Sequence, residues 1–226
     1  AGLTINEFAS NIKTETNCRK ICFAGRLDPM ARGQVLLLID EECKKLPDMI
    51  TKDKTYQFEI IPGFQTDSDD PLGIIENMSD QSNGIIDKIS KILSENIYPS
   101  SFNQKFHSLS SKRVNGKPLW EYHKKGIKLE EYPSHKVEIK SLKIIDNFLR
   151  NFKDFRNDVI KTIDLVDKRC DFRQNEIIKQ WNTIEKDIVE SILVEITVSS
   201  GFYVRQFVRD LSDKLNHPLM VYDINR

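Results

Sequence analysis

Several features that define other classes of protein are missing from this sequence of 226 residues. No segment approaches the roughly 18 consecutive apolar residues that a membrane helix needs, and the first residues lack the basic start and apolar core of a signal peptide. We find no internal repeat, low-complexity tract or glycine-rich phosphate loop. The composition, 39% hydrophobic and 30% charged, is instead typical of a soluble globular protein.

Cysteine is scarce, and its spacing does not predict a metal site. The four cysteines include one pair four residues apart, Cys18 and Cys22, but no second Cys/His pair completes a zinc site. We therefore expect reduced thiols, no metal and an intracellular compartment.

Charge of one sign is not in excess, since 34 basic residues balance 34 acidic ones. A net charge of zero disfavours nucleic-acid binding in general, because phosphate affinity depends on clustered Lys and Arg. The distribution is uneven, however: residues 105–140 hold nine Lys or Arg and four Glu. This stretch is either a basic patch on a neutral protein or an ordinary solvated face.

The hydrophobic periodicity predicts a mixed α+β sheet. Thr4 and Glu7 have the spacing of a capping box before a helix over 5–14. Strands do not alternate regularly with helices elsewhere, which argues against a doubly wound fold. We treat 1–226 as one domain, in which 148–188 is an inserted helical or flexible segment. The other expected elements are strands at 35–39 (buried), 54–62, 135–146, 191–200 and 218–226, and helices at 84–97 and after Gly201.

The first candidate for chemistry is Asp28, in the segment "GRLDPMARG". Its ordinary interpretation is a turn in which Asp28 pairs with Arg26 or Arg32. The functional interpretation is a carboxylate that an arginine keeps ionised, as a nucleophile or general base must be. This motif alone favours the salt-bridged turn.

Two further stretches are ambiguous by themselves. "KTYQFEIIPGFQTDSDDPLG" is a strand followed by an acidic loop whose spacing fits no EF-hand, and Tyr56 in it could be an ordinary core aromatic. "NQKFHSLSSKRVNGKPLWEYHKKG" is a basic loop before a short helix. It could also follow RNA phosphates, through Lys105, Lys112, Arg113 and Lys117.

The last candidate is the segment "SSGFYVRQFVRDL". A turn at Gly201 would direct Arg205 from the first turn of a helix, with Arg209 one turn later on the same face. A buried arginine needs an acidic partner. Asp28 and Asp210 are the two candidates.

Taken together and in this order, these four stretches resemble the TruB-type pseudouridine synthases. That family has "G-x-LDP-x-A-x-G", then "K-x-Y-x-F" with "G-x-x-T-D-x-x-D-x-x-G", then "K-V-N-G…L-Y-E", then "S-x-G-x-Y-[IV]-R". The resemblance covers most of the chain except about 148–188. The RluA and RsuA branches share the "GRLD" segment but lack the "KVNG…YE" block.

The resemblance implies a pseudouridine synthase fold, a mixed, mainly antiparallel sheet flanked by helices with a central RNA-binding cleft. It implies that Asp28 is the catalytic aspartate, that Arg205 pairs with it and that Tyr56 stacks on the target base. The reaction isomerises an RNA uridine, most typically in the tRNA T-loop, without metal or organic cofactor. We expect a monomer whose partner is RNA.

The sequence also departs from the family. Phe23 stands where bacterial members have a histidine, and Arg32 adds a positive charge beside the site, so Arg26 and Arg32 join the expected RNA contacts. His107 replaces a proline and is expected to contact RNA as well. The C-terminal RNA-binding PUA domain of the family is not expected in this sequence. Two alternatives remain: a catalytically inactive RNA-binding or RNA-chaperone relative, and a structural subunit.

Overall fold

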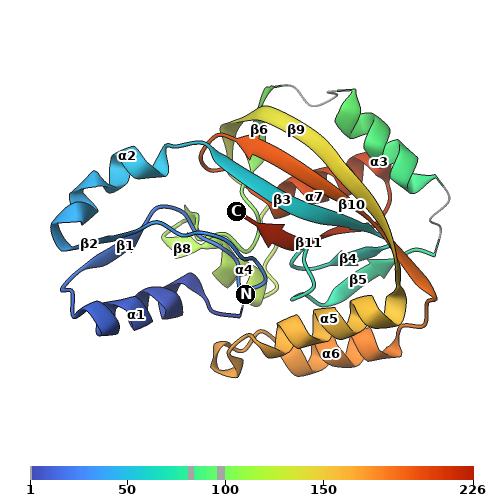
Figure 1. The fold of residues 1–226 in the computed structure, drawn as a ribbon, viewed down its shortest axis with the longest axis horizontal. Helices are drawn as coiled ribbons and strands as arrows, with labels where there is room; N and C mark the ends of the chain where they lie inside the picture. Colours follow the sequence, from blue (N-terminus) through green and yellow to red (C-terminus); the bar gives the residue numbers. More distant parts are fainter. Residues whose placement is uncertain (1, 81–83, 96–99) are drawn as a thin grey trace.

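A computed structural model describes residues 2–80, 84–95 and 100–226. Its centre is a five-stranded sheet that curves across the molecule, with every neighbouring pair of strands antiparallel (Figure 1). The mainly antiparallel sheet with flanking helices is therefore confirmed. The strand order is β11 (Leu219–Asn225), β3 (Lys54–Pro62), β10 (Ile188–Val198), β9 (Ser134–Asn151) and β6 (Ser101–Lys105).

The two faces of the sheet bury two separate apolar cores. Neighbouring side chains of a strand point to opposite faces, so Ile60 and Ile61 of β3, both fully buried, enter different cores. Helices α7 (Val204–Leu215) and α3 (Ile85–Ser94) pack into the core that contains Ile60. Helices α5 (Phe152–Asp164) and α6 (Gln174–Thr183) pack into the other.

The segment for which the sequence left a helix or a flexible insertion open is helical. It contains α5, a short 3-10 helix (Lys168–Cys170) and α6, which lie side by side below the sheet in Figure 1. Its large apolar side chains are buried against Phe64, whose ring centre is 5.3 Å from that of Trp181. The two helices are thus joined to the body of the protein by a packed core.

The N-terminal part forms a small subdomain beside the sheet (Figure 1). It comprises α1 (Ile5–Thr16), β1 (Ile21–Phe23), β2 (Leu37–Ile39), a 3-10 helix (Asp40–Lys45) and α2 (Leu46–Ile50). The predicted capping box is present, with Thr4 and Glu7 bonded reciprocally.

The prediction of a buried strand over 35–39 is wrong in part. Only Leu37–Ile39 is a strand, and it pairs with β1 alone. This two-stranded sheet is not part of the central core, and Leu36, just before the strand, and Ile39, at its end, are 46% and 40% exposed. Leu38 is the buried member of the strand.

Two short hairpins carry the loops of interest. In the first, β4 (Phe64–Thr66) and β5 (Ile75–Met78) are connected by the acidic turn, residues 67–74. The second joins β7 (Arg113–Val114) to β8 (Lys117–Pro118) just before α4 (Leu119–Lys124). Asn115 and Gly116 both have positive φ, 49° and 79°, as a two-residue type I′ turn requires.

The other predicted elements are found with shifted ends. The helix expected over 84–97 runs from Ile85 to Ser94, and its last two expected residues lie outside the described ranges. The strands at 54–62 and 191–200, the helix after Gly201 and the final strand correspond to β3, β10, α7 and β11. Among the described residues, no helix is both long and apolar enough to cross a membrane.

Candidate active site and RNA interface

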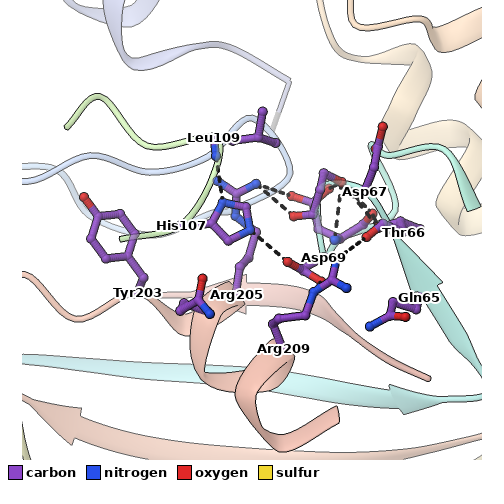
Figure 2. A network of polar contacts seen from close by, with 12 residues as sticks. Gln65, Thr66, Asp67, Asp69, His107, Leu109, Tyr203, Arg205 and Arg209 are labelled. Carbon is purple, nitrogen blue, oxygen red and sulfur yellow. Dashed lines mark hydrogen bonds and ion pairs between the residues drawn. The ribbon is translucent and has the colours of Figure 1, made fainter. Parts of the chain in front are cut away.

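Helix α7 directs two arginines at the acidic turn. Arg205 and Arg209 are four residues apart and therefore lie on one face of the helix, as Figure 2 shows. The Nε of Arg209 is 2.6 Å from Oδ1 of Asp69, and its Nη2 donates to the carbonyl of Thr66 at 3.1 Å. Arg205 donates through Nη1 to the carbonyl of Ser68 at 3.1 Å and lies 3.5 Å from Asp70.

The second amino group of Arg205 reaches Asp28. Its Nη2 donates to Oδ1 of Asp28 at 2.6 Å, across 177 positions of the sequence. The side chain of Arg205 is 9% exposed and that of Asp28 36%. The guanidinium is therefore held in the interior, while the carboxylate is partly accessible to solvent.

The arginines next to Asp28 in the sequence have other contacts. Arg26 lies over the ring of Phe23, 5.0 Å from its centre. Arg32 forms an ion pair with Asp223 of β11. Of the two partners expected for Arg205, Asp28 is the one it contacts, because Asp210 accepts a hydrogen bond from Gln206 instead.

Burial and charge oppose each other at this centre. Burial lowers the pKa of Arg205, but the carboxylates of Asp28, Asp70 and Asp69 outweigh it, so the pKa stays above its ordinary value. Burial dominates for the acids and raises the pKa values of Asp69 and Asp70 to about 6, despite the two arginines. Asp69 and Asp70 are therefore mainly ionised near neutral pH and become neutral in mild acid.

His107 is not on the surface, which corrects the expectation that it contacts RNA. It is 1% exposed, and its Nε2 lies 2.9 Å from Oδ2 of Asp69 (Figure 2). Its Nδ1 accepts a hydrogen bond from the amide of Leu109, and burial lowers its pKa well below the usual value. A neutral His107 with its proton on Nε2 satisfies both contacts, so it supports Asp69 and has no ring nitrogen left for RNA.

Tyr56 lies on β3 between the core and the charged centre. It is 8% exposed and belongs to the apolar cluster around Phe58. Burial raises the pKa of its hydroxyl, with a smaller contribution from Asp28 that Arg226 opposes. The hydroxyl therefore stays protonated near neutral pH.

The loop that carries Asp28 is attached to the end of the sheet. Arg32 forms a parallel bridge with Asn225, and the amide of Gln34 donates to the carbonyl of Arg226 at 3.0 Å. Gly33 has a φ of 126°, and a Cβ there would be 2.2 Å from the carbonyl oxygen of Arg226. Only glycine permits this close approach, so Gly33 fixes where the Asp28 loop lies.

The predicted basic contacts lie on a neighbouring surface. Lys105, Lys112, Arg113 and Lys117 are all exposed, the last two on the β7–β8 hairpin. Lys112 lies 4.8 Å from the ring centre of Phe106, and this ring is 5.8 Å from that of Tyr203, two residues before Arg205. The basic surface and the Asp28–Arg205 pair are therefore adjacent.

The position of the acidic turn beside the α7 arginines was not predicted from the sequence. The sequence indicated only a loop unsuited to calcium, whereas Asp69 and Asp70 are the buried partners of the two α7 arginines. The sequence did contain a signal for this pairing. Two buried arginines on one helix face need more than one carboxylate partner, and Asp28 supplies only one. The Asn-Gly hairpin was also missed, although that dipeptide is a strong hairpin signal.

No metal centre is visible in the part of the chain that the structure describes, where no three His, Cys, Asp or Glu side chains are grouped as ligands. Cys18, Cys22 and Cys43 are free thiols. The absence of a metal or cofactor from the reaction stays a prediction.

Comparison with solved structures defines the class of fold. The chain superposes over its whole length on a Cbf5–Nop10–Gar1 complex, with a TM-score of 0.56 and 13% identity, covering 45% of that chain. It superposes similarly on an H/ACA RNP bound to a substrate RNA containing 2′-deoxyuridine, with a TM-score of 0.55, 13% identity and 43% of that chain covered. The chain thus shares its fold with the proteins of these two complexes.

Sequence comparison narrows this to one family. Residues 13–162 match the N-terminal domain of the TruB family pseudouridylate synthases, and the chain belongs to that family. A tRNA pseudouridine synthase B of Ureaplasma urealyticum is 28% identical over 95% of this chain and 76% of its own length. The protein of that name from Aquifex aeolicus is 30% identical over 95% of this chain, which spans 60% of it.

Proposed function

We propose that this protein is an RNA pseudouridine synthase that isomerises a flipped-out uridine of tRNA, in the T-loop, with Asp28 as the nucleophile. The observation that carries the proposal is the Asp28–Arg205 pair, at 2.6 Å, in which a buried arginine holds a half-exposed carboxylate. Membership of the TruB family and relatives named tRNA pseudouridine synthase B support the RNA substrate.

The chemistry requires what these residues offer. A uridine within a folded loop must leave its stack to be reached, at a cost of a few kcal/mol, and an aromatic ring such as Tyr56 can receive it. An ionised Asp28 then attacks the sugar or the base, or assists cleavage of the glycosidic bond. The bond from N1 to C1′ breaks and its electron pair leaves with the uracil, which then turns. C5 bonds to C1′, any bond that Asp28 had formed breaks and restores the carboxylate, and the proton lost from C5 is matched by one gained at N1.

Arg205 contributes by electrostatics and geometry. Its guanidinium donates one hydrogen bond to Asp28 and one to the backbone of Ser68, so the carboxylate is held in one place before the substrate arrives. Such a fixed charge in a partly dry site acts more strongly than it would in water. Arg26, Arg32, Lys105, Lys112, Arg113 and Lys117 would bind the RNA phosphates.

Turnover of a T-stem-loop RNA labelled with tritium at C5 of its uridines tests the proposal, because loss of the C5 proton releases the label. The control is the same stem-loop with cytidine at the target position. Release of label together with detection of pseudouridine supports the enzyme. RNA binding without release supports the inactive binder, and failure to bind RNA at low salt supports a structural subunit.

The proposal also includes a monomeric protein in an intracellular compartment. Sedimentation of the purified chain, and fractionation of cells that express it, test these two parts.

A further inference from the structure

The connection between α5 and α6, residues 165–173, contacts the N-terminal residues and the end of α4; the two helices that it joins are labelled in Figure 1. At its start, the backbone of Leu165 packs closely on Gly2, whose φ is 102°. A Cβ added to Gly2 would lie only 2.7 Å from the carbonyl oxygen of Leu165. The amide of Gly2 in turn donates at 2.7 Å to the carbonyl of Pro29, next to Asp28. Further along, Asp171 lies 3.4 Å from Lys124 at the end of α4.

The strongest of these contacts is made by Arg173. Its guanidinium binds the carboxylate of Asp67 through both amino groups, with Nη1 2.7 Å from Oδ2 and Nη2 3.1 Å from Oδ1. A two-pronged contact of this kind fixes orientation as well as distance. The Asp67 side chain is 12% exposed and that of Arg173 43%, so the acid is the buried partner.

Asp67 is bonded within the acidic turn at the same time. Its Oδ1 accepts from the amide of Ile74 at 2.9 Å, and its own amide donates to the carbonyl of Ile74 at 3.0 Å. Its Oδ2 also lies 3.8 Å from Nε2 of His123 on α4. Burial opposes ionisation of Asp67, but His123 and Arg173 outweigh it and lower the pKa to about 2.

From Asp67 a short path leads to the catalytic aspartate. The next residue, Ser68, accepts through its carbonyl the hydrogen bond from Arg205, and Arg205 donates to Asp28. On the other side, His123 belongs to the helix that follows the basic β7–β8 hairpin. Asp67 thus joins the catalytic pair and the proposed RNA-binding surface, and Arg173 holds Asp67.

We propose that Arg173 is a positioning residue for this site: through Asp67 it fixes the acidic turn, and with it the geometry of the Arg205–Asp28 pair. The inference rests on the proposed synthase function. Arg173 lies beyond the family match, which ends at residue 162, whereas the acidic turn lies within it. The α7 arginines hold this turn on one side, and Arg173 adds a second contact that holds it.

The test compares Arg173→Ala with Lys179→Ala, which removes the same charge from an exposed position of α6. With saturating T-stem-loop RNA we expect Arg173→Ala to lower the single-turnover rate constant by about tenfold or more, since small misplacements of reacting groups have large effects. The RNA dissociation constant should change by less than about threefold, as expected for one exposed charge. Lys179→Ala should behave as the wild type.

Amide hydrogen exchange provides a readout that does not depend on turnover. Arg173→Ala should speed exchange at the amides of Asp67 and Ile74, while Lys179→Ala should not. Asp67→Asn should lower the rate constant as well, and adding Arg173→Ala to it should have little further effect, because the two side chains act as one unit. All measurements are made well below the melting temperature of each variant.

Three outcomes would overturn the inference. One is an unchanged rate constant in Arg173→Ala, whatever the exchange data show. Another is a large loss of RNA affinity with an unchanged rate, which would make Arg173 an RNA contact. The third is additive effects of the two substitutions. If the wild type itself releases no tritium, the proposed function fails, and unchanged exchange in Arg173→Ala would then reject the positioning role separately.

Discussion

Two regions of this protein use basic residues in opposite ways. On α7, Arg205 and Arg209 are largely buried, and each has a carboxylate and a backbone carbonyl as partners. On the β7–β8 hairpin and its flanks, Lys112, Arg113 and Lys117 are exposed. Buried charge must be paired and therefore becomes rigid, whereas exposed charge remains available to a ligand and is screened by salt.

We therefore expect the buried arginines of α7 to determine the rate of the reaction, and the exposed basic residues of the hairpin to determine RNA affinity. Changes at the buried centre should affect the rate of conversion and leave RNA affinity nearly unchanged. Changes at the hairpin should affect affinity and its salt dependence, while the rate at saturating RNA is preserved. The following predictions test this division.

The largest effect is expected for Asp28→Asn. The amide keeps the size of the carboxylate but cannot act as a nucleophile, so the single-turnover rate constant should fall by on the order of 10³-fold or more. RNA affinity should be retained, as a filter-binding titration would show. Substantial remaining activity would remove Asp28 from its assigned role.

Arg205→Lys should come next. A lysine keeps the charge but cannot donate to both Asp28 and the carbonyl of Ser68 in the planar arrangement observed. We expect the rate constant at saturating RNA to fall by about 100-fold, in the range seen for loss of one fixed donor. A variant that converts RNA as fast as the wild type would show that charge alone is enough at this position.

Acid should slow the reaction through the acidic turn. Because the pKa values of Asp69 and Asp70 are raised to about 6, lowering the pH through 6 neutralises the acids that hold Arg209 and Arg205. The rate constant should fall by about tenfold per pH unit once one such protonation dominates. As a control, Lys117→Ala should show the same fall in rate constant below pH 6. A rate constant that does not change with pH down to 5 would contradict the role of the turn.

The smallest effect is expected for Lys117→Ala. This exposed residue should contribute one phosphate contact, so the variant should bind T-stem-loop RNA a few-fold more weakly. The slope of log affinity against log salt should decrease by about one unit. Lys179→Ala on α6 is the matched control, and equal slopes in all three proteins would place Lys117 outside the RNA interface.

Much of the fold could be predicted from the sequence, because its signals are local. The capping box at Thr4 and Glu7 is present as expected. The alternation of Tyr56, Phe58 and Ile60 corresponds to a central strand. Prediction failed where burial depends on neighbours. Val35–Ile39 is as apolar as a core strand, yet only Leu37–Ile39 forms one, and it lies in a two-stranded sheet.

The site was predicted less completely. Asp28, Arg205 and Tyr56 were identified by order and spacing of motifs, and their roles stay predictions. His107 was expected to contact RNA because it stands at a proline position of the family motif, whereas its ring is buried against Asp69. Nothing in the local sequence shows whether the ring of His107 is exposed or buried, because its burial depends on which segments pack over the loop.

The sequence by itself determined which residues can do chemistry and in which family the chain lies, because motif identity and periodicity are properties of short stretches. Only the tertiary structure decided the pairing of charges. Asp28 has arginines two and four positions away along the chain, yet its partner is Arg205, since α7 brings a buried guanidinium that must find an acid. Likewise, Asp67 meets Arg173 only because α6 packs beneath the sheet.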